Sequence, residues 1–256
     1  MPQMLADDIR SQVVTREIAP GQSLPSEKEL IETYGVSRPT LREAIRILEA
    51  ESLVETRRGS KGGVIVRVPD PDVVIRQAAV LLQLSGATMR DVYGCQMALE
   101  PAAVRVVAAN RSESDLEALR AIIEEGRVCL EDDPMAFGPV AGRFHRTVVY
   151  LSGSATMSFI VDMLASITDA TYHTKVKRLS SKARAEQIRR SLASWNHLVS
   201  LIEAKDVDGA QQQWVKHLET VGANTDDKVA LAAYVATNGS RPGNDSTLPN
   251  RGRAIS

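Results

Sequence analysis

Three arginines recur at four-residue intervals in the N-terminal part of the chain: Arg38, Arg42 and Arg46. On a helix this spacing places the three side chains in one stripe about 80° wide, because each residue advances by about 100°. An apolar stripe lies on another face of the same helix: Leu41, Ile45 and Leu48. A helix that buries one face and exposes guanidinium groups on another fits the DNA major groove, where Arg bonds guanine O6 and N7 in pairs.

The residues around this helix predict the elements that hold it in place. Apolar residues at helical spacing predict a first helix over residues 4–17. An S-x-x-E capping box at Ser26 starts a short second helix, which ends near Tyr34 at a glycine. Ser37 caps the third helix, and two short strand patterns follow it, separated by a basic, glycine-rich tip over residues 57–63. This order predicts a winged helix-turn-helix.

Charge supports this prediction locally but not overall. The formal net charge of the 256 residues is −1, so total charge indicates no nucleic-acid partner. Residues 1–68 hold ten Lys or Arg and ten Asp or Glu, whereas residues 37–68 hold seven cations and four acids. Positive charge therefore concentrates on the third helix and the hairpin. A merely solvated charged helix is the alternative, but it does not account for the order of elements around it.

The N-terminal sequence resembles the signature of GntR-family regulators over two stretches, from Ala19 to Leu30 and from Tyr34 to Ala44. The resemblance implies that side chains of the third helix enter the major groove and that the wing tip reaches the minor groove. The DNA contacts predicted in this way are Arg38, Thr40, Arg42, Arg46, Arg58, Lys61 and Gly62. One departure is Ser52, where the family usually has glycine, and it predicts a slightly shifted turn between helix and wing.

The remainder of the chain predicts a helical bundle. From residue 73 to about 235 no convincing strand pattern is present, and apolar residues recur at intervals of three and four. Two prolines predict a linker over 69–72, and the composition of 236–256 predicts a disordered tail. The expected fold class is therefore mainly α: a winged helix-turn-helix with a small β-hairpin wing over 1–68, and an antiparallel bundle of six or seven helices over 73–235.

The bundle resembles the FCD domain of the FadR subfamily through short motifs such as Leu99-Glu100 and Phe144-His145. Many FCD domains hold a divalent metal with one carboxylate and three histidines. In this chain Ala141 and Trp195 occupy two of those positions, which leaves only His145 and His217 as metal ligands. An incomplete site of this kind argues against zinc or another divalent metal, and no cofactor is expected.

The same resemblance implies an effector site, for which the predicted residues are Gln96, Arg143, His145, Trp195 and His217. The alternative for the two histidines is a structural role in the core, with hydrogen bonds to neighbouring residues. His197 is expected to point away from the core, and His217 toward it. Residues 171–190 hold seven cations and one acid, which would attract an anionic effector or add a DNA contact. A solvated helical surface is the simpler interpretation of this segment.

Two other function classes are alternatives to a ligand-responsive regulator. An enzyme joined to a DNA-binding domain is disfavoured, because Leu151 to Ala155 lacks the first glycine of a G-x-S-x-G elbow and no glycine-rich phosphate loop is present. A DNA-binding protein that needs no ligand remains open.

The absence of a signal peptide, of a long apolar stretch and of a C-x-x-C pattern predicts a cytoplasmic protein with no membrane partner. The prediction is a homodimeric repressor of double-stranded operator DNA that is released by a small anionic metabolite, such as an organic acid or an acyl-CoA.

Overall fold

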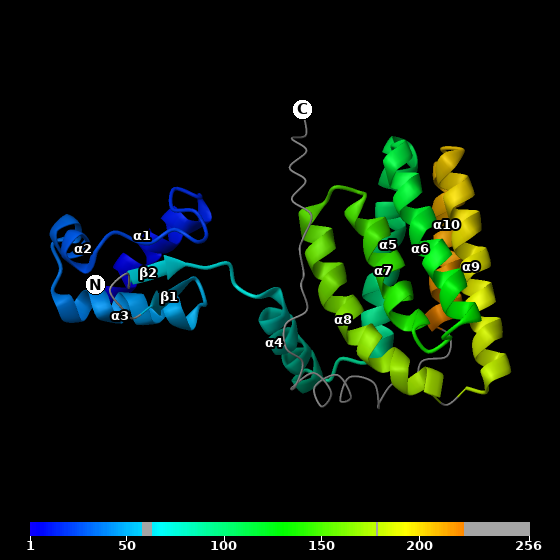
Figure 1. The fold of residues 1–256 in the computed structure, drawn as a ribbon, viewed down its shortest axis with the longest axis horizontal. Coiled ribbons are helices and arrows are strands. Elements are labelled where there is room, and N and C mark those ends of the chain that lie inside the picture. The colour runs from blue at the N-terminus through cyan, green and yellow to red at the C-terminus, as the bar shows by residue number, and fades with distance from the viewer. Residues whose placement is uncertain (58–62, 178, 223–256) are drawn as a thin grey trace. The chain divides into compact units, whose positions relative to one another are not determined.

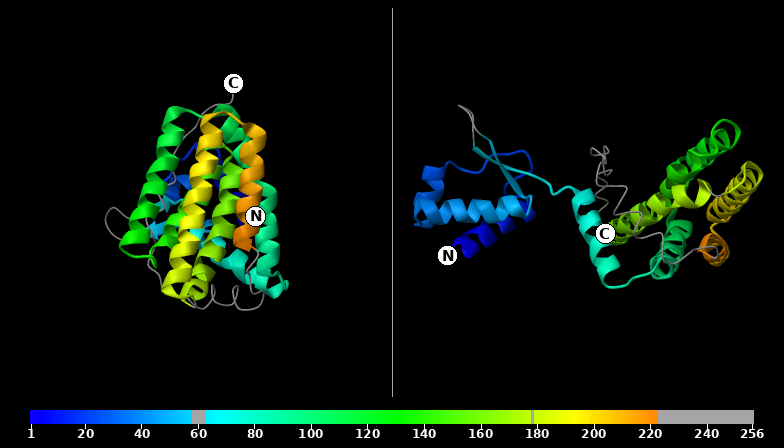
Figure 2. Two further views of the ribbon diagram at one scale, coloured as in Figure 1. Left: turned by 90° about the vertical axis from the view of Figure 1, so that its right-hand side faces the viewer. Right: turned by 90° about the horizontal axis from the view of Figure 1, so that it is seen from below.

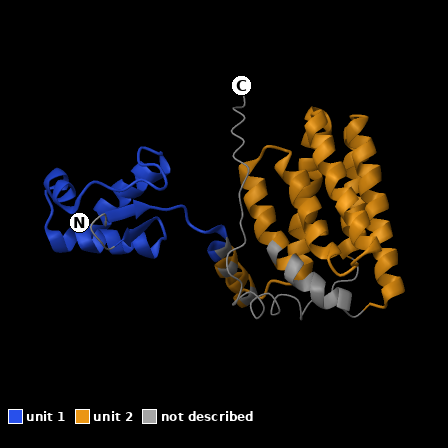
Figure 3. Cartoon of the chain, viewed as in Figure 1, with its two compact units in different colours: residues 1–74 blue, residues 75–256 orange. Residues whose placement is uncertain are grey.

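The computed structural model describes residues 1–57, 63–177 and 179–222, and the chain forms two compact units, Met1–Val74 and Ile75–Ser256 (Figures 1 and 3). The first unit contains three complete helices, α1 (Pro2–Val14), α2 (Glu27–Tyr34) and α3 (Arg38–Ala50), within its described residues. They are followed by an antiparallel hairpin of β1 (Val54–Arg57) and β2 (Gly63–Val66). This order confirms the predicted winged helix-turn-helix.

Side-chain caps start the two helices of the helix-turn-helix where the sequence predicts. Ser26 and Glu29 form a reciprocal capping box at α2, in which the Ser26 backbone N–H donates to Glu29 Oε2 over 2.8 Å. Gly35 closes the helix with a φ of +61°, a conformation that costs glycine little. Ser37 then accepts a hydrogen bond from the Thr40 backbone N–H and starts α3.

One face of α3 forms the centre of the first core. Leu41, Ala44 and Leu48 are buried there and pack with Leu5 and Ile9 of α1. Residues of the hairpin and of the 19–25 segment complete this core, and the segment is tied to β2 by backbone hydrogen bonds. Because the apolar face of α3 is buried, its arginine face is directed to solvent.

Ser52 closes the turn between α3 and the wing in a left-handed conformation, with a φ of +58°. The Leu53 N–H donates to Leu48 O over 3.0 Å, and the Ser52 N–H donates to Glu49 O over 2.9 Å. These two bonds are those of a Schellman motif, which glycine usually closes. Serine therefore adopts here a backbone conformation that a Cβ atom disfavours.

The predicted linker over 69–72 is too long, because helix α4 (Pro71–Leu84) begins inside it. The prediction assumed that both prolines exclude regular structure. Proline is nevertheless well suited to the first position of a helix, since its missing N–H would have no intrahelical partner there. Residues 67–70 have no regular structure.

The second unit is a bundle in which α4 is followed by six further helices within the described residues (Figure 2). They are α5 (Met89–Asn110), α6 (Glu113–Glu131), α7 (Phe137–Tyr150), α8 (Ala155–Lys177), α9 (Ser181–Glu203) and α10 (Val207–Gly222). Helix α10 packs on α5 and α9, and α7 packs on α6 and α8. The predicted all-helical bundle is confirmed. Among the described residues no helix is both long and apolar enough to cross a membrane.

Aromatic rings fill the centre of this bundle. Trp195 of α9 stacks on Phe144 with ring centroids 4.3 Å apart and on Phe137 with centroids 5.3 Å apart. Gly126 lets α6 approach them closely, because a Cβ atom there would lie 2.8 Å from a methyl carbon of Leu192. The bundle interior is thus packed by side chains at the level of Trp195.

Candidate functional site

The arginine stripe of α3 is exposed along its whole length. The side chains of Arg38 and Arg42 are each 67% exposed and that of Arg46 is 76% exposed. Thr40 is half-buried at the start of the helix, where its hydroxyl oxygen lies 2.8 Å from that of Ser37. The three guanidinium groups therefore form a basic surface on a rigid helix, as the sequence predicts.

Carboxylates lie beside all three arginines. Glu27 Oε1, in the first turn of α2, lies 3.2 Å from Arg38 Nε and 3.4 Å from Arg42 Nε. Glu43 Oε2 lies 3.3 Å from Arg46 Nη1. The sequence does not single out Glu27, because nothing in the periodicity of either helix shows that α2 brings this side chain to α3.

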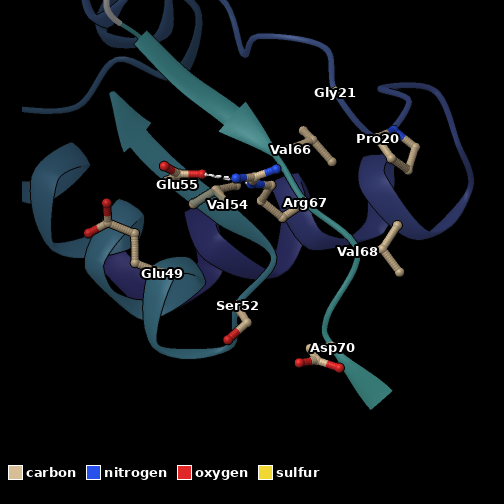
Figure 4. A pocket seen from close by; sticks show the side chains of 10 residues that line it. All are labelled: Pro20, Gly21, Glu49, Ser52, Val54, Glu55, Val66, Arg67, Val68 and Asp70. Carbon is tan, nitrogen blue, oxygen red and sulfur yellow. Dashed lines mark hydrogen bonds and ion pairs between the residues drawn. The ribbon is translucent and has the colours of Figure 1, made fainter. Parts of the chain in front are cut away.

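The structure describes the two strands of the wing but not its tip, residues 58–62. The predicted contacts Arg58, Lys61 and Gly62 lie outside the described residues. Figure 4 shows a hollow beside the hairpin, lined by Pro20, Gly21, Glu49, Ser52, Val54, Glu55, Val66, Arg67, Val68 and Asp70. Its acids outnumber its one cation, Arg67, which pairs with Glu55. A lining of this charge would repel phosphate, so the hollow is not added to the predicted DNA contacts.

A buried polar network crosses the centre of the bundle from α5 to α10. His145 Nδ1 donates to Glu100 Oε2 over 2.8 Å, and the Trp214 indole N–H donates to the same oxygen over 3.0 Å. On the other side, His145 Nε2 lies 3.3 Å from His217 Nε2, which also accepts a hydrogen bond from Trp195 Nε1 over 3.4 Å. Because His217 Nε2 is an acceptor, its ring proton is on Nδ1.

The structure brings three of the five predicted effector residues together: His145, Trp195 and His217. Gln96 is buried on α5, one turn before Glu100. Arg143 lies elsewhere, because two residues along a helix turn it about 200° from His145; it is exposed and pairs with Glu125 of α6. The predicted orientations of His217 and His197 are confirmed, since His217 is buried and His197 is exposed.

Glu100 and Trp214 are the two residues of this network that are not among the predicted site residues. Glu100 is the more informative of the two. It is fully buried, and its second oxygen, Oε1, has no hydrogen-bond partner. In the sequence, Glu100 stands out only as part of the Leu99-Glu100 motif, which assigns the carboxylate no role. The signal in the sequence is an acid among the apolar residues of a predicted helix. A buried acid normally needs a partner, so such a position indicates a polar site inside the bundle.

The environment keeps His217 neutral. Burial, together with neighbouring His145, lowers the pKa of His217 to about 3. Desolvation is the larger cause, because removing an imidazolium from water disfavours its charged form. His217 thus serves as a neutral hydrogen-bonding group over the physiological pH range.

The donor set does not fit a resident metal ion. His145 and His217 present nitrogen atoms to each other, but the indole N–H of Trp195 points at the His217 lone pair that a metal would need. Ala141 offers no ligand atom, and two protein ligands are fewer than structural or catalytic zinc sites use. Among the described residues, no group of three or more His, Cys, Asp or Glu could hold a metal ion.

The basic segment at 171–190 is only partly described, because the side chains of 171–178 lie outside the described residues. In the remainder, Arg189 lies near Glu186 at 3.7 Å and is exposed, and Arg184 donates to the backbone oxygen of Leu179. Exposed Arg189 agrees with a solvated helical surface, whereas Arg184 is half-buried, so both interpretations of the segment stay open.

Comparison with known families gives two matches. A family model described as "Bacterial regulatory proteins, gntR family" matches residues 2–64, and one described as "FCD domain" matches residues 91–220. The two matched ranges contain the arginine stripe and the buried polar network, respectively.

Individual relatives extend over nearly the whole chain. The HTH-type transcriptional regulator Mce2R of Mycobacterium tuberculosis is 30% identical over 249 residues, which are 94% of this chain and 95% of that protein. The HTH-type transcriptional repressor NanR of Enterobacter sp. (strain 638) is 24% identical over 228 residues, 86% and 83% of the two chains. The solved structure of a GntR protein from Streptococcus agalactiae superposes with a TM-score of 0.66 at 20% identity, covering 88% of this chain and all of that one, which supports the fold.

Proposed function

The chain belongs to the gntR family of bacterial regulatory proteins and carries an FCD domain, and we propose that it is a repressor released from its operator by a small anionic metabolite. DNA-binding regulation of transcription is the activity of this family. The named relatives are regulators and not enzymes, in agreement with the predicted absence of catalysis. We place its action in the cytoplasm, where operator DNA lies.

The exposed arginine stripe of α3 carries the DNA-reading part of the proposal. Burial of Leu41 and Leu48 fixes the rotation of the helix, so Arg38 and Arg42 project from a rigid support. Each guanidinium can donate two parallel hydrogen bonds to guanine in the major groove. Arg46, one turn further on, adds charge for phosphates. The predicted wing contacts would add minor-groove binding.

The buried network around His145 supports an effector site in the bundle. Polar groups inside a protein core are costly unless they are satisfied, and Glu100 Oε1 lacks a partner. Gln96 offers amide N–H groups in the same region, and such donors suit a carboxylate or phosphate oxygen. The N–H groups of His145 and Trp195 already donate to Glu100 and His217, so an effector would have to replace one of these bonds to be held by them. An effector that prefers the non-binding arrangement of the chain by about 1–3 kcal/mol would weaken DNA affinity some 5- to 150-fold.

A regulator that needs no ligand is the second candidate, and the packing of the bundle favours it. Trp195, Phe137 and Phe144 stack beside the buried polar network, so a ligand would have to displace side chains to bind there. The two candidates make opposite predictions about the response of the DNA complex to metabolites.

The test begins with selection of a binding sequence from a randomised duplex library by the full-length protein. Fluorescence anisotropy then measures the affinity for the selected duplex, with and without a panel of organic acids and acyl-CoA thioesters, in buffer containing EDTA. The proposal predicts specific binding that at least one anion weakens fivefold or more. Failure to enrich any sequence would contradict the DNA-reading assignment. Indifference to every anion and to fractionated cell extract would favour the ligand-free candidate, and a response that EDTA abolishes and zinc restores would contradict the metal-free site.

A further inference from the structure

A single carboxylate oxygen bridges two arginines of the DNA-reading helix. Glu27 Oε1 lies 3.2 Å from Arg38 Nε and 3.4 Å from Arg42 Nε. We propose that Glu27 is a positioning residue that holds both arginines in a base-reading conformation and thereby raises selectivity for the operator over other DNA. The inference rests on the proposed function, since it concerns the same surface.

Local capping brings Glu27 to this position. The Ser26 capping box makes Glu27 the first residue of α2, and the Ser37 cap makes Arg38 the first residue of α3. Leu30 is buried in the core that α2 shares with α3, which fixes the face that α2 turns toward its neighbour. Both ends of the ion pairs are therefore attached to ordered first turns, and neither belongs to a loose loop.

The atoms involved suit a positioning role. In both pairs the contact is at Nε, the nitrogen nearest the side-chain stem, and in this arrangement the terminal nitrogens Nη1 and Nη2 are the groups that would reach guanine O6 and N7. Arg46 differs, because its pair with Glu43 uses the terminal atom Nη1. Glu27 thus contacts Arg38 and Arg42 at Nε, next to the aliphatic part of the side chain, whereas Glu43 contacts Arg46 at a terminal nitrogen.

The contacts of Glu27 with the two arginines affect the affinity for operator DNA and the affinity for other DNA differently. Restricting two long side chains before binding reduces the entropy lost when they dock on guanines. The negative charge of Glu27 also repels phosphates, and this repulsion weakens binding to any sequence. Selectivity is the difference between two affinities, so a residue that assists base contacts and opposes phosphate contacts increases it. Exposed ion pairs contribute little to folding stability, so the effect belongs to binding.

Two variants separate geometry from charge. Glu27→Asp keeps the charge but shortens the side chain by one methylene, so it cannot reach both Nε atoms. Glu27→Gln removes the charge. The matched control is Glu32→Gln on the same helix. Glu32 Oε1 lies 3.8 Å from Lys28 Nζ, and Glu32 pairs with no arginine of α3. The Ser26–Glu29 capping box remains in all three, and melting curves should coincide with that of the wild type.

The readout is the ratio of dissociation constants for a scrambled duplex and for the duplex selected by the wild-type protein, measured with the full-length chain at two salt concentrations. We expect E27D to lower this ratio about three- to tenfold with scrambled-duplex affinity nearly unchanged. We expect E27Q to lower the ratio as well while tightening binding to the scrambled duplex, and E32Q to change both constants by the same factor.

A wild-type ratio in E27D would overturn the inference, because charge alone would then account for Glu27. Equal changes in both constants for E27Q, as for the E32Q control, would overturn it in the same way. A wild-type protein that does not distinguish the two duplexes would instead refute the proposed function, and the inference with it.

Discussion

Single side chains on α3 and in the bundle carry the chemistry proposed for this protein, and they do so in opposite environments. Arg38 and Arg42 are exposed and lie beside Glu27, whereas His217 is buried and neutral. The first kind of residue acts through its attraction for a polyanion. The second acts through hydrogen bonds that only a dry interior makes strong.

Replacing Arg42 with alanine should weaken binding to the selected operator by about tenfold or more, because each paired Arg–guanine contact contributes about 1–3 kcal/mol of discrimination. Arg38→Ala should have an effect of similar size. Arg105→Ala is the charge-matched control, since Arg105 lies in the other unit and pairs with Asp208 at 2.5 Å. Anisotropy titrations measure all three. Normal operator binding by both α3 variants would show that another element reads the bases.

His217 should make folding stability depend on acid. The folded chain holds the pKa of His217 at about 3, against an ordinary value near 6.5 in the unfolded chain. Between these values only the unfolded state binds the proton, so the free energy of unfolding falls as the pH drops from about 6.5, by up to about 1.4 kcal/mol per pH unit. Above pH 6.5 the full contribution is retained.

Urea unfolding at pH 7.5 and pH 5.0 checks this expectation. The wild type should lose about 1–2 kcal/mol more than His217→Gln between the two pH values. The control His197→Gln changes an exposed histidine and should behave like the wild type. Equal losses in wild type and H217Q would mean that His217 is protonated in the folded chain.

Two turns of the first unit, one after α2 and one after α3, each contain a residue with a positive φ. The residue types at these two positions suit that conformation to different degrees. Gly35 suits its left-handed turn, whereas Ser52 occupies one of the same kind with a Cβ atom. The Schellman bonds around Ser52 hold the turn despite this cost. The departure from the family pattern thus alters the energy of the turn and keeps its hydrogen bonds.

Ser52→Gly should therefore stabilise the protein by about 0.5–1.5 kcal/mol, because glycine adopts positive φ without the clash of a side chain. Ser11→Gly in the exposed face of α1 is the opposite control and should destabilise by about 0.5 kcal/mol, since glycine is a poor helix former. Urea unfolding at pH 7.5 measures both. A destabilised S52G variant would indicate that the serine side chain makes a contribution larger than its backbone cost.

The chain as a whole combines a unit that reads DNA with a larger helical unit that contains a polar centre. One reading unit offers a single short helix to the groove, which limits the number of base contacts. Two-fold association doubles those contacts and matches a pseudo-palindromic site. We therefore expect the protein to act as a homodimer, with the helical unit providing the interface.

Sedimentation equilibrium should give twice the mass of the chain at micromolar concentration, and a footprint on the selected duplex should cover two half-sites related by two-fold symmetry. Half-sites separated by about one helical turn of DNA, 10–10.5 base pairs, or a multiple of it, place both α3 helices on one side of the duplex. A monomer that protects a single half-site would contradict this expectation.

Local features of this protein follow from its sequence alone. The caps at Ser26 and Ser37, the left-handed Gly35 and the buried stripe of α3 all depend on residues within four positions of one another. Hydrogen bonds of this range and the helical period act in the same way in any globular protein, so the helix-turn-helix and the exposure of its arginines were predictable. The inward orientation of His217 followed from the same period.

Contacts between distant residues were decided only by the tertiary structure. Glu27 reaches Arg38 and Arg42 because α2 packs beside α3, and Glu100 meets Trp214, 114 positions along the chain, because α10 packs on α5. Periodicity states which face of a helix is buried but not which residue on another helix faces it. The position and rotation of packed helices depend on the fit of whole side-chain surfaces, a property that no single stretch of sequence contains.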